Sequence, residues 1–217
     1  ETLQSELGVI RAQFEPIKRR LFATMFPHTA GVVLYLQAGR SAWHHVGFFM
    51  RSYVMWAKAQ KLKATAYTCL WVPHELRPGT LKDDPVAGWR WREHMPNTSE
   101  SPLPTTAALA VSGDSAQLLF AAESGTQRIL DGGSDAVVRV RFEPRAVTHA
   151  SQLWHPHEVT PGMSGVEIRR FSVSRSMVKD ARTQKEHPFA AEAFDCGPLF
   201  DDYVSWRVFG ADAEPWQ

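Results

Sequence analysis

Hydrophobic positions near the start of the chain recur at the spacing of an amphipathic helix. Steps of three and four residues separate six apolar side chains: Leu3, Leu7, Ile10, Phe14, Ile17 and Leu21. This spacing aligns them along one helical stripe. Pro16 falls inside the stripe and lacks the amide hydrogen that an interior helical position donates. The pattern predicts a helical N-terminal extension over residues 1–28, kinked or divided near Pro16.

A strand, a helix and a second strand are predicted between residues 31 and 72. Residues 31–36, GVVLYL, and 64–72, ATAYTCLWV, are rich in the β-branched and aromatic residues of buried strands. Residues 42–62 place large apolar side chains on one helical stripe and end among lysines, which suit a helix C-terminus. We expect this helix to form part of the core.

Proline and glycine are concentrated over residues 73–113, which predicts an irregular insertion outside the core. Inside it, Trp89 and Trp91 flank Arg90, and Arg92 follows. Such a mixture packs back onto its own domain, anchors a protein surface or stacks on an unpaired base. The sequence leaves these three alternatives open.

Regular structure is expected again from residue 116. In residues 136–144, AVVRVRFEP, apolar and charged positions alternate, which indicates a half-buried strand. Residues 166–179 predict another strand, and 181–217 form a C-terminal extension apolar enough to pack against the domain. The predicted fold is α+β: a mixed or antiparallel sheet packed against a core helix, in a domain spanning residues 29–180.

The amino-acid composition limits the classes of function that this chain can have. The chain has 217 residues, 44% of them hydrophobic, so one substantial core is the expectation. The net charge of +1 gives no strong overall field for polyanions, so any nucleic-acid contact must be local. Two distant cysteines form no metal knuckle or disulfide framework, which favours an intracellular setting. No apolar run approaches the roughly 20 residues of a membrane span.

Basic residues supply candidate RNA contacts, because arginine and lysine bind phosphate oxygens. Solvated surface positions are the alternative interpretation of each. The nine candidates are Lys18, Arg19, Arg20, Arg90, Arg92, Arg169, Arg170, Arg175 and Lys179.

No residue set in the sequence predicts a catalytic, cofactor or metal site. His44-His45 and His155-Pro156-His157-Glu158 offer metal-ligand residue types, but Pro156 prevents its two neighbours from sharing a helical face. No Gly-x-Ser-x-Gly elbow presents a nucleophile, and no glycine-rich loop ending in Lys-Ser or Lys-Thr cradles phosphates.

Several ordered segments resemble the central domain of class I peptide chain release factors. They are Ala38-Gly39, Arg51-Ser52-Tyr53, Trp56-Ala57 and Glu123-Ser124-Gly125-Thr126-Gln127-Arg128, within residues 31–72 and 115–148. In the family, a strand runs into a Glu-x-Gly-Val-His-Arg segment equivalent to the last of these. The resemblance implies a release-factor-like domain.

The sequence departs from that family at its functional motifs. It contains no Gly-Gly-Gln, the loop whose glutamine directs water onto the peptidyl-tRNA ester in the family. Gly132-Gly133-Ser134 is the nearest candidate, but it precedes the strand that should lead into the loop. Where the loop should lie, RRFSVSRSMVKD has no glycine for a positive-φ turn. Stop-codon-reading motifs are missing as well, so we expect Glu123 to Arg128 to be scaffold, with Gly125 allowing a bend and Arg128 pairing across strands.

Together, the resemblance and the departures imply a protein without catalysis. We expect a structural component or assembly factor of an organellar ribosome, mitochondrial or alternatively plastid, that contacts ribosomal RNA and ribosomal proteins. A chain that begins at Glu1 is compatible with a removed leader peptide. Two alternatives remain: a divergent peptidyl-tRNA hydrolase using residues 175–185, and an organellar factor that binds messenger RNA.

Overall fold

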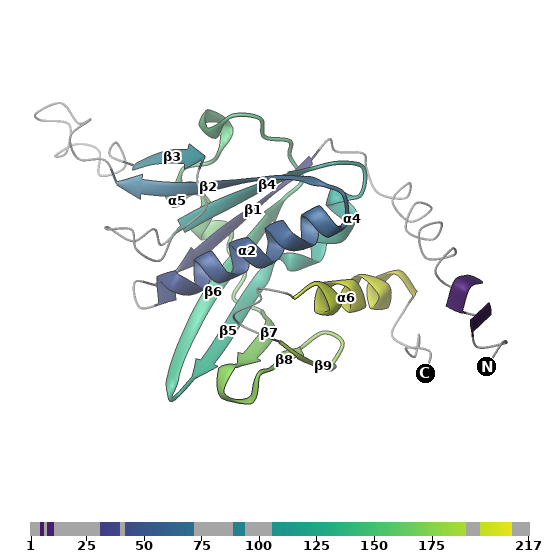
Figure 1. Cartoon of the computed structure of the whole chain (residues 1–217). Coiled ribbons are helices and arrows are strands. Elements are labelled where there is room, and N and C mark those ends of the chain that lie inside the picture. Colours follow the sequence, from purple (N-terminus) through teal and green to yellow (C-terminus); the bar gives the residue numbers. More distant parts are fainter. Residues whose placement is uncertain are drawn as a thin grey trace, which may run out of the picture.

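A single nine-stranded sheet organises the described part of the chain (Figure 1). The computed structural model describes residues 5–6, 8–10, 31–39, 42–71, 89–93, 106–189 and 196–209. The strand order is β3-β2-β4-β1-β6-β5-β7-β8-β9. Every neighbouring pair is antiparallel except β5 and β7, which run parallel. The predicted α+β class with a mixed sheet and a core helix is confirmed.

The strands are β1 (Gly31–Ala38), β2 (Lys63–Trp71), β3 (Trp89–Glu93), β4 (Thr106–Ser112), β5 (Gly125–Asp131), β6 (Ser134–Glu143), β7 (Glu167–Ser172), β8 (Met177–Asp180) and β9 (Glu186–Pro188). The α-helices are α2 (Trp43–Ala59), α4 (Ala116–Phe120), α5 (Pro156–Val159) and α6 (Gly197–Phe209). Short 3-10 turns are η3 (Ala121–Glu123), η4 (Ala150–Gln152), η5 (Thr160–Gly162) and η6 (Val173–Arg175).

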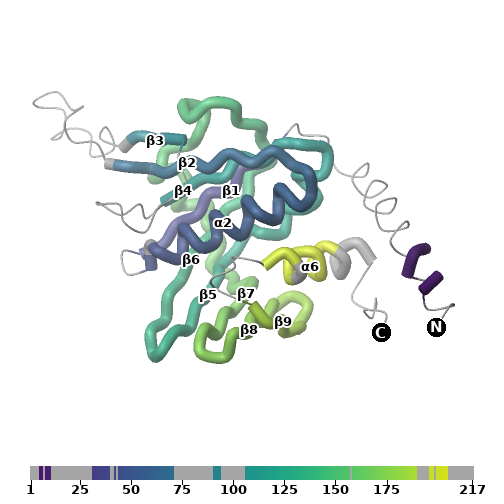
Figure 2. Tube along the Cα trace, in the orientation of Figure 1, coloured from purple at the N-terminus to yellow at the C-terminus, as the bar shows by residue number. Residues whose placement is uncertain are grey.

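Helices α2 and α6 cover one face of the sheet, which we call the helix face (Figure 2). Alternate strand residues such as Leu34 and Leu109 point to this face and are fully buried with Phe49 and Trp56 of α2. Asp201 of α6 accepts hydrogen bonds from Trp56 Nε1 at 3.2 Å and from the Gln60 side chain at 3.0 Å. The C-terminal extension therefore packs against the domain, as its apolar composition predicts.

A smaller cluster covers the upper part of the opposite face. Tyr35 and Tyr67 point there from β1 and β2 and meet Leu153 and Trp154 from the segment after β6. The Tyr35 hydroxyl accepts hydrogen bonds from the Trp154 amide at 2.9 Å and the Arg145 guanidinium at 2.8 Å. Among the described residues, this cluster includes no side chain of β7, β8 or β9.

Two strands lie within residues 73–113, where an irregular insertion is the sequence-based expectation. β3 forms one edge of the sheet, and β4 lies between β1 and β2 with six successive buried residues. The surrounding prolines hid β4, whose core segment Thr106-Ala107-Ala108-Leu109-Ala110 is mostly alanine and so carries little strand signal. The interpretation of this end of the segment as a loop outside the core is wrong.

The structure of the segment before Glu123 also differs from the one that the family resemblance implies. A strand running into Glu123 is implied by the family, but residues 116–123 form α4 followed by η3. Leu118, Leu119 and Phe120 are buried there, and Phe120 packs against Trp56 with 4.7 Å between ring centroids. The helix thus fills the helix-face core beside α2.

The N-terminal extension is described only at its beginning. Residues 5–6 and 8–10 are helical and exposed, with Val9 and Ile10 more than half exposed. The remaining positions of the predicted stripe, together with Lys18, Arg19 and Arg20, lie outside the described residues. Among the helices of the described ranges, none has the length and apolarity needed to cross a membrane.

Candidate functional site

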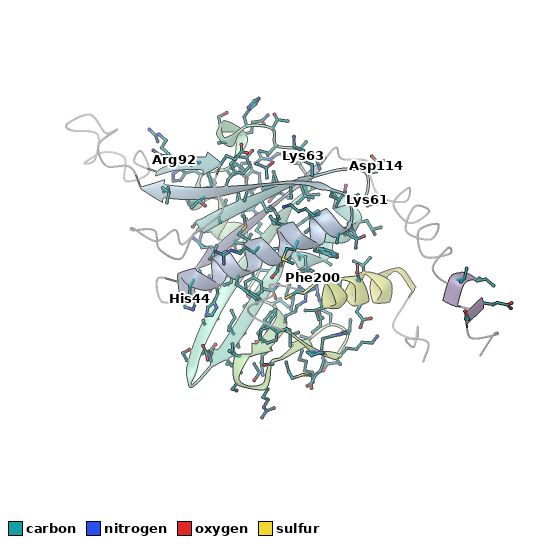
Figure 3. All side chains as sticks on the ribbon, in the orientation of Figure 1. His44, Lys61, Lys63, Arg92, Asp114 and Phe200 are labelled. Atoms are coloured by element: carbon teal, nitrogen blue, oxygen red, sulfur yellow. The ribbon has the colours of Figure 1, made fainter. Side chains whose placement is uncertain are left out.

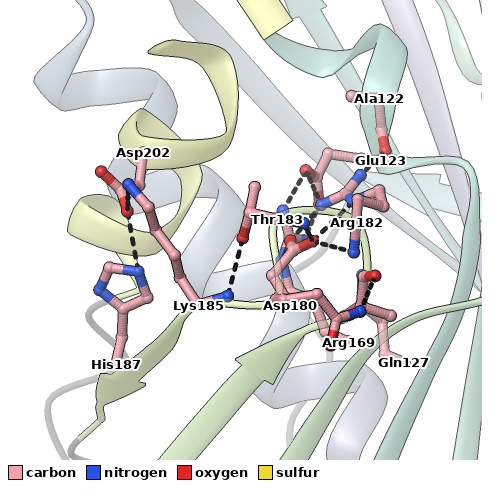
Figure 4. Close-up of polar contacts among 12 residues, drawn as sticks. Ala122, Glu123, Gln127, Arg169, Asp180, Arg182, Thr183, Lys185, His187 and Asp202 are labelled. Carbon is pink, nitrogen blue, oxygen red and sulfur yellow. Dashed lines mark hydrogen bonds and ion pairs between the residues drawn. The ribbon is translucent and has the colours of Figure 1, made fainter. Parts of the chain in front are cut away.

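Glu123, the first residue of the family-like segment, is buried in an ionic network (Figure 4). Its side chain is 1% exposed, and the two carboxylate oxygens accept hydrogen bonds from both terminal nitrogens of Arg169. The Tyr53 hydroxyl of α2 donates to the same carboxylate at 2.8 Å. Each carboxylate oxygen of Glu123 thus accepts at least one hydrogen bond from Arg169 or Tyr53.

Asp180 and Arg182 extend this network to the end of β8. Arg169 Nε donates to Asp180 at 3.0 Å, and Arg182 donates to both Asp180 oxygens. Arg182 also donates to the carbonyl oxygen of Ala122, next to Glu123. Both guanidiniums lie over rings of α6, Arg169 over Phe200 at 4.8 Å and Arg182 over Tyr203 at 3.4 Å. The network therefore joins η3, β7, β8 and α6.

Charge complementarity keeps these groups ionised in the interior. Burial acts to raise the pKa of Glu123, but the charges of Arg169 and Arg182 hold that pKa below its ordinary value. Burial likewise acts against the ionised form of Asp180, and hydrogen bonds from Arg182 with the charge of Arg169 lower its pKa. Burial raises the pKa of Tyr53, and the adjacent Glu123 charge raises it further. A carboxylate held this way is a poor proton donor or acceptor at neutral pH.

The rest of the family-like segment forms strand β5 and its contacts. A Cβ on Gly125 would lie 2.4 Å from the Ile168 side chain and 3.0 Å from the Val166 carbonyl oxygen, so glycine permits a close approach of β5 to β7. Arg128 forms ion pairs with Asp135 of β6 at 3.5 Å and Glu167 of β7 at 3.3 Å. Cross-strand pairing by Arg128 is confirmed.

Arg169 does not fit its predicted role as an RNA contact. Its side chain is 0% exposed, and its donors are committed to Glu123 and Asp180. The sequence did carry a signal: Arg169 and Phe171 share one side of a strand, and a large aromatic residue marks that side as buried. Arg169 is therefore a core residue of the helix face.

Three other predicted candidates converge on a hollow in the opposite face of the sheet. Arg170 of β7, Arg175 of η6 and Lys179 of β8 line it, and its volume is about 660 Å³. The tip of the β5–β6 hairpin, Gly132-Gly133, forms another wall. Strand register explains the convergence, because Arg170 lies directly opposite Lys179 on the paired strands. The other lining residues are Leu130, Asp131, Ser134, Asp135, Ser172, Ser174, Met177, Val178 and Glu186.

The hollow combines free cations with acidic groups. Arg170 pairs with Glu167 at 2.8 Å and is about half exposed. Arg175 and Lys179 are exposed, and neither forms an ion pair with any residue in the described ranges. Asp131, Asp135 and Glu186 contribute carboxylates to the same lining. This arrangement suits a ligand that carries both a negative charge and hydrogen-bond donors.

The turn inside this hollow stands where the resemblance places the hydrolytic loop. β7 and β8 are joined by η6 and by Ser176, which adopts the left-handed conformation with φ 48° and ψ 42°. The expectation that a segment without glycine avoids positive φ is wrong at this one position. The connection is a short hairpin turn that brings Ser172 opposite Met177.

Arg90 and Arg92 lie far from the hollow, on β3 at the other edge of the sheet, where Figure 3 labels Arg92. Both are exposed, while Trp91 between them packs on the opposite-face cluster and donates to the Trp154 carbonyl oxygen at 3.0 Å. For Trp91, packing onto its own domain is thus the alternative that the structure favours. The side chain of Trp89 lies outside the described residues.

The histidines flagged by the sequence do not assemble a metal centre in the described ranges. No group of three histidine, cysteine or acidic side chains is placed to hold a metal ion there. The rings of His44 and His45 at the start of α2 are tilted by 48° to one another, with 3.8 Å between their centroids. Burial, with the charge of His44, lowers the pKa of His45 to about 4. His45 is therefore neutral at pH 7.

Comparisons with known proteins agree on architecture alone. No family model matches the chain, and no curated protein sequence matches it. Among solved structures, RF2 of Thermus thermophilus superposes with a TM-score of 0.57 at 15% sequence identity. The match covers 95% of this chain and 76% of that chain. The fold is release-factor-like. At this level of identity the likeness establishes the fold, and it agrees with the resemblance read from residues 31–72 and 115–148.

Proposed function

We propose that this chain is a non-catalytic, release-factor-like component of the mitochondrial ribosome, acting as a structural subunit or assembly factor. It contacts ribosomal RNA through local basic residues and neighbouring ribosomal proteins through its remaining surface. A plastid ribosome is the alternative setting. The release-factor-like fold supports an association with the translation machinery, since RF2 of Thermus thermophilus is among the solved structures that it resembles.

The observation that carries the proposal is the combination of that fold with the β7–η6–β8 turn. Residues 173–176 close the hairpin where a hydrolytic loop would be expected, without glutamine or glycine. The strands on either side are tied to the interior by Arg169 and Asp180. Hydrolysis of an ester needs a group that positions and deprotonates water. Glu123 and Asp180 are withheld from that task by their ion pairs.

The experiment is a peptidyl-tRNA hydrolysis assay with the purified chain, both alone and with ribosomes. We expect turnover equal to the buffer control, and the variants Arg175→Ala and Lys179→Ala should give the same rate. Turnover above the control that these changes abolish would establish the rival function, a peptidyl-tRNA hydrolase using residues 175–185. Binding to messenger RNA without association with either ribosomal subunit would instead support the other alternative, an organellar factor that binds messenger RNA.

A further inference from the structure

We propose that the hollow between the β5–β6 tip and the β7–β8 hairpin binds one unpaired nucleotide of RNA. Arg175 and Lys179 hold its phosphate, the apolar floor supports its base, and the acidic rim accepts hydrogen bonds from base or ribose donors. This inference rests on the proposed function, because it names the RNA element that the ribosome-associated chain would contact.

The size and floor of the hollow fit a nucleotide. Its volume of about 660 Å³ lies within the range of roughly 300–1,000 Å³ typical of small-molecule sites. Leu130 is 37% exposed and Met177 is half-buried, and both lie on the opposite face of the sheet. Leu130 lies opposite Ser172 on β7, which in turn lies opposite Met177 on β8. Leu130 and Met177 thus flank Ser172 on either side, and a base can lie across Ser172 between the two apolar side chains.

The cations that would bind the phosphate lie beside that floor. Lys179 stands two residue pairs further along β8 than Met177, opposite Arg170, and Arg175 lies in the turn before Ser176. Arg170 is already paired with Glu167, whereas Arg175 and Lys179 have no acidic partner in the described ranges. Two available cations suit one phosphate group, and Ser174 adds a hydroxyl to the same lining.

Acidic groups decide which RNA the hollow accepts. Glu186 lies opposite Lys179 on β9, and Asp131 and Asp135 line the hairpin wall. These carboxylates repel a duplex, which presents a continuous row of phosphates and keeps its base edges paired. An unpaired base presents free N–H groups that a carboxylate accepts, and guanine offers more of them than uracil. The balance of charges thus selects a nucleotide displayed outside a helix.

The test measures fluorescence anisotropy of a short labelled ribonucleotide strand with the whole purified chain. The same strand annealed to its complement is the duplex probe. We expect the single strand to bind at least about fivefold more tightly than the duplex at low salt, and Lys179→Ala to weaken single-strand binding about fivefold. The slope of log affinity against log salt should fall by roughly 0.7, the value for one phosphate contact on a single strand. Equal affinity for the two probes would overturn the inference.

Lys63→Ala is the matched control, because Lys63 is exposed at the start of β2, on the far half of the sheet (Figure 3). It should leave both affinity and salt slope unchanged; equal losses in Lys63→Ala and Lys179→Ala would reject the hollow as the site. Glu186→Gln tests the base contact: a preference for a guanosine strand over a uridine strand should fall in this variant. A wild-type chain without that preference would contradict the assigned role of the acidic rim.

These outcomes are separable from those of the proposed function. A chain that migrates with ribosomal subunits but shows no effect of Lys179→Ala on strand binding refutes the nucleotide site alone. A chain that binds the strand through Lys179 yet never migrates with ribosomes refutes the ribosomal role and leaves the nucleotide site standing.

Discussion

Arg169 and Glu123 lie 46 residues apart and meet as a buried, doubly hydrogen-bonded ion pair. Neither side chain is more than 1% exposed. The pair ties β7 to the turn before β5, and these two strands form the parallel step of an otherwise antiparallel sheet. A glutamate in the family-like segment thus serves the architecture, because its partner comes from the segment where a catalytic loop would be expected.

Removing one partner of this buried ion pair should lower the free energy of unfolding far more than removing one partner of an exposed ion pair. Glu123→Gln or Arg169→Met leaves an uncompensated charge in the core, so we expect a loss of about 3–5 kcal/mol in the free energy of unfolding. Urea unfolding followed by circular dichroism measures this. Arg170→Ala, next in sequence and paired with Glu167 at the surface, should cost less than about 1 kcal/mol. Similar losses at both arginines would contradict the structural role of the pair.

Acid should weaken the same network. The pKa values of Glu123 and Asp180 lie below their ordinary values of 4.5 and 3.8 in the folded protein. Their stabilising contribution is therefore complete above those ordinary values and is lost as pH falls through the folded pKa values. Unfolding free energies measured from neutral pH down to pH 3 should fall steeply at the acidic end. In Glu123→Gln the fall should be shallower; an unchanged slope would argue against the ionised form of Glu123.

His45 should add a second, milder pH dependence at higher pH. Burial and the charge of His44 lower its pKa from 6.5 to about 4, while Asp131 acts in the opposite sense. Below its ordinary pKa the unfolded chain binds a proton at this position more readily than the folded chain. Stability should therefore decline as pH falls from 6.5 toward 4. His45→Asn should reduce that decline in thermal unfolding, and a decline identical to wild type would place its cause elsewhere.

The contact at Gly125 predicts a difference between two glycines. Gly125→Ala forces a Cβ to within 2.4 Å of Ile168, so we expect a loss of about 1–3 kcal/mol from overpacking. Gly165→Ala has no atom within 4 Å of the added carbon and should change stability by less than about 0.5 kcal/mol. Denaturant midpoints of the two variants provide the comparison. If the two substitutions were equally tolerated, β5 and β7 would not approach as closely as described.

Sequence periodicity predicted the β1–α2–β2 unit well, because long apolar stripes and β-branched runs specify local structure. It failed at β4, where small residues become core only because α2 packs on them, and at the helix before Glu123. Arg169 is buried because it pairs with Glu123, which is far away in the sequence. The sequence therefore offered little reason to treat Arg169 and the adjacent Arg170 differently as candidate RNA contacts. One indication of this burial was present: Arg169 lies two residues before Phe171, so both side chains point to the same side of the strand.

The hollow was predictable only in part. Arg170, Arg175 and Lys179 stood out as basic residues, and register brought them together. Leu130 and Glu186 did not stand out, because they join the site through the parallel β5–β7 pairing and the β8–β9 hairpin. Pairings between distant strands leave no periodic trace in the sequence. The charged residues of the hollow can therefore be identified from the local sequence, but the strand pairings that bring them together cannot.

Sedimentation of the tagged chain through a sucrose gradient, from lysed mitochondria at moderate salt, tests the central claim most directly. A non-catalytic ribosomal component should migrate with one ribosomal subunit and its RNA, and salt-resistant migration would exclude a purely electrostatic association. If the chain remains at the top of the gradient while both subunits migrate away, the proposed ribosomal role is contradicted.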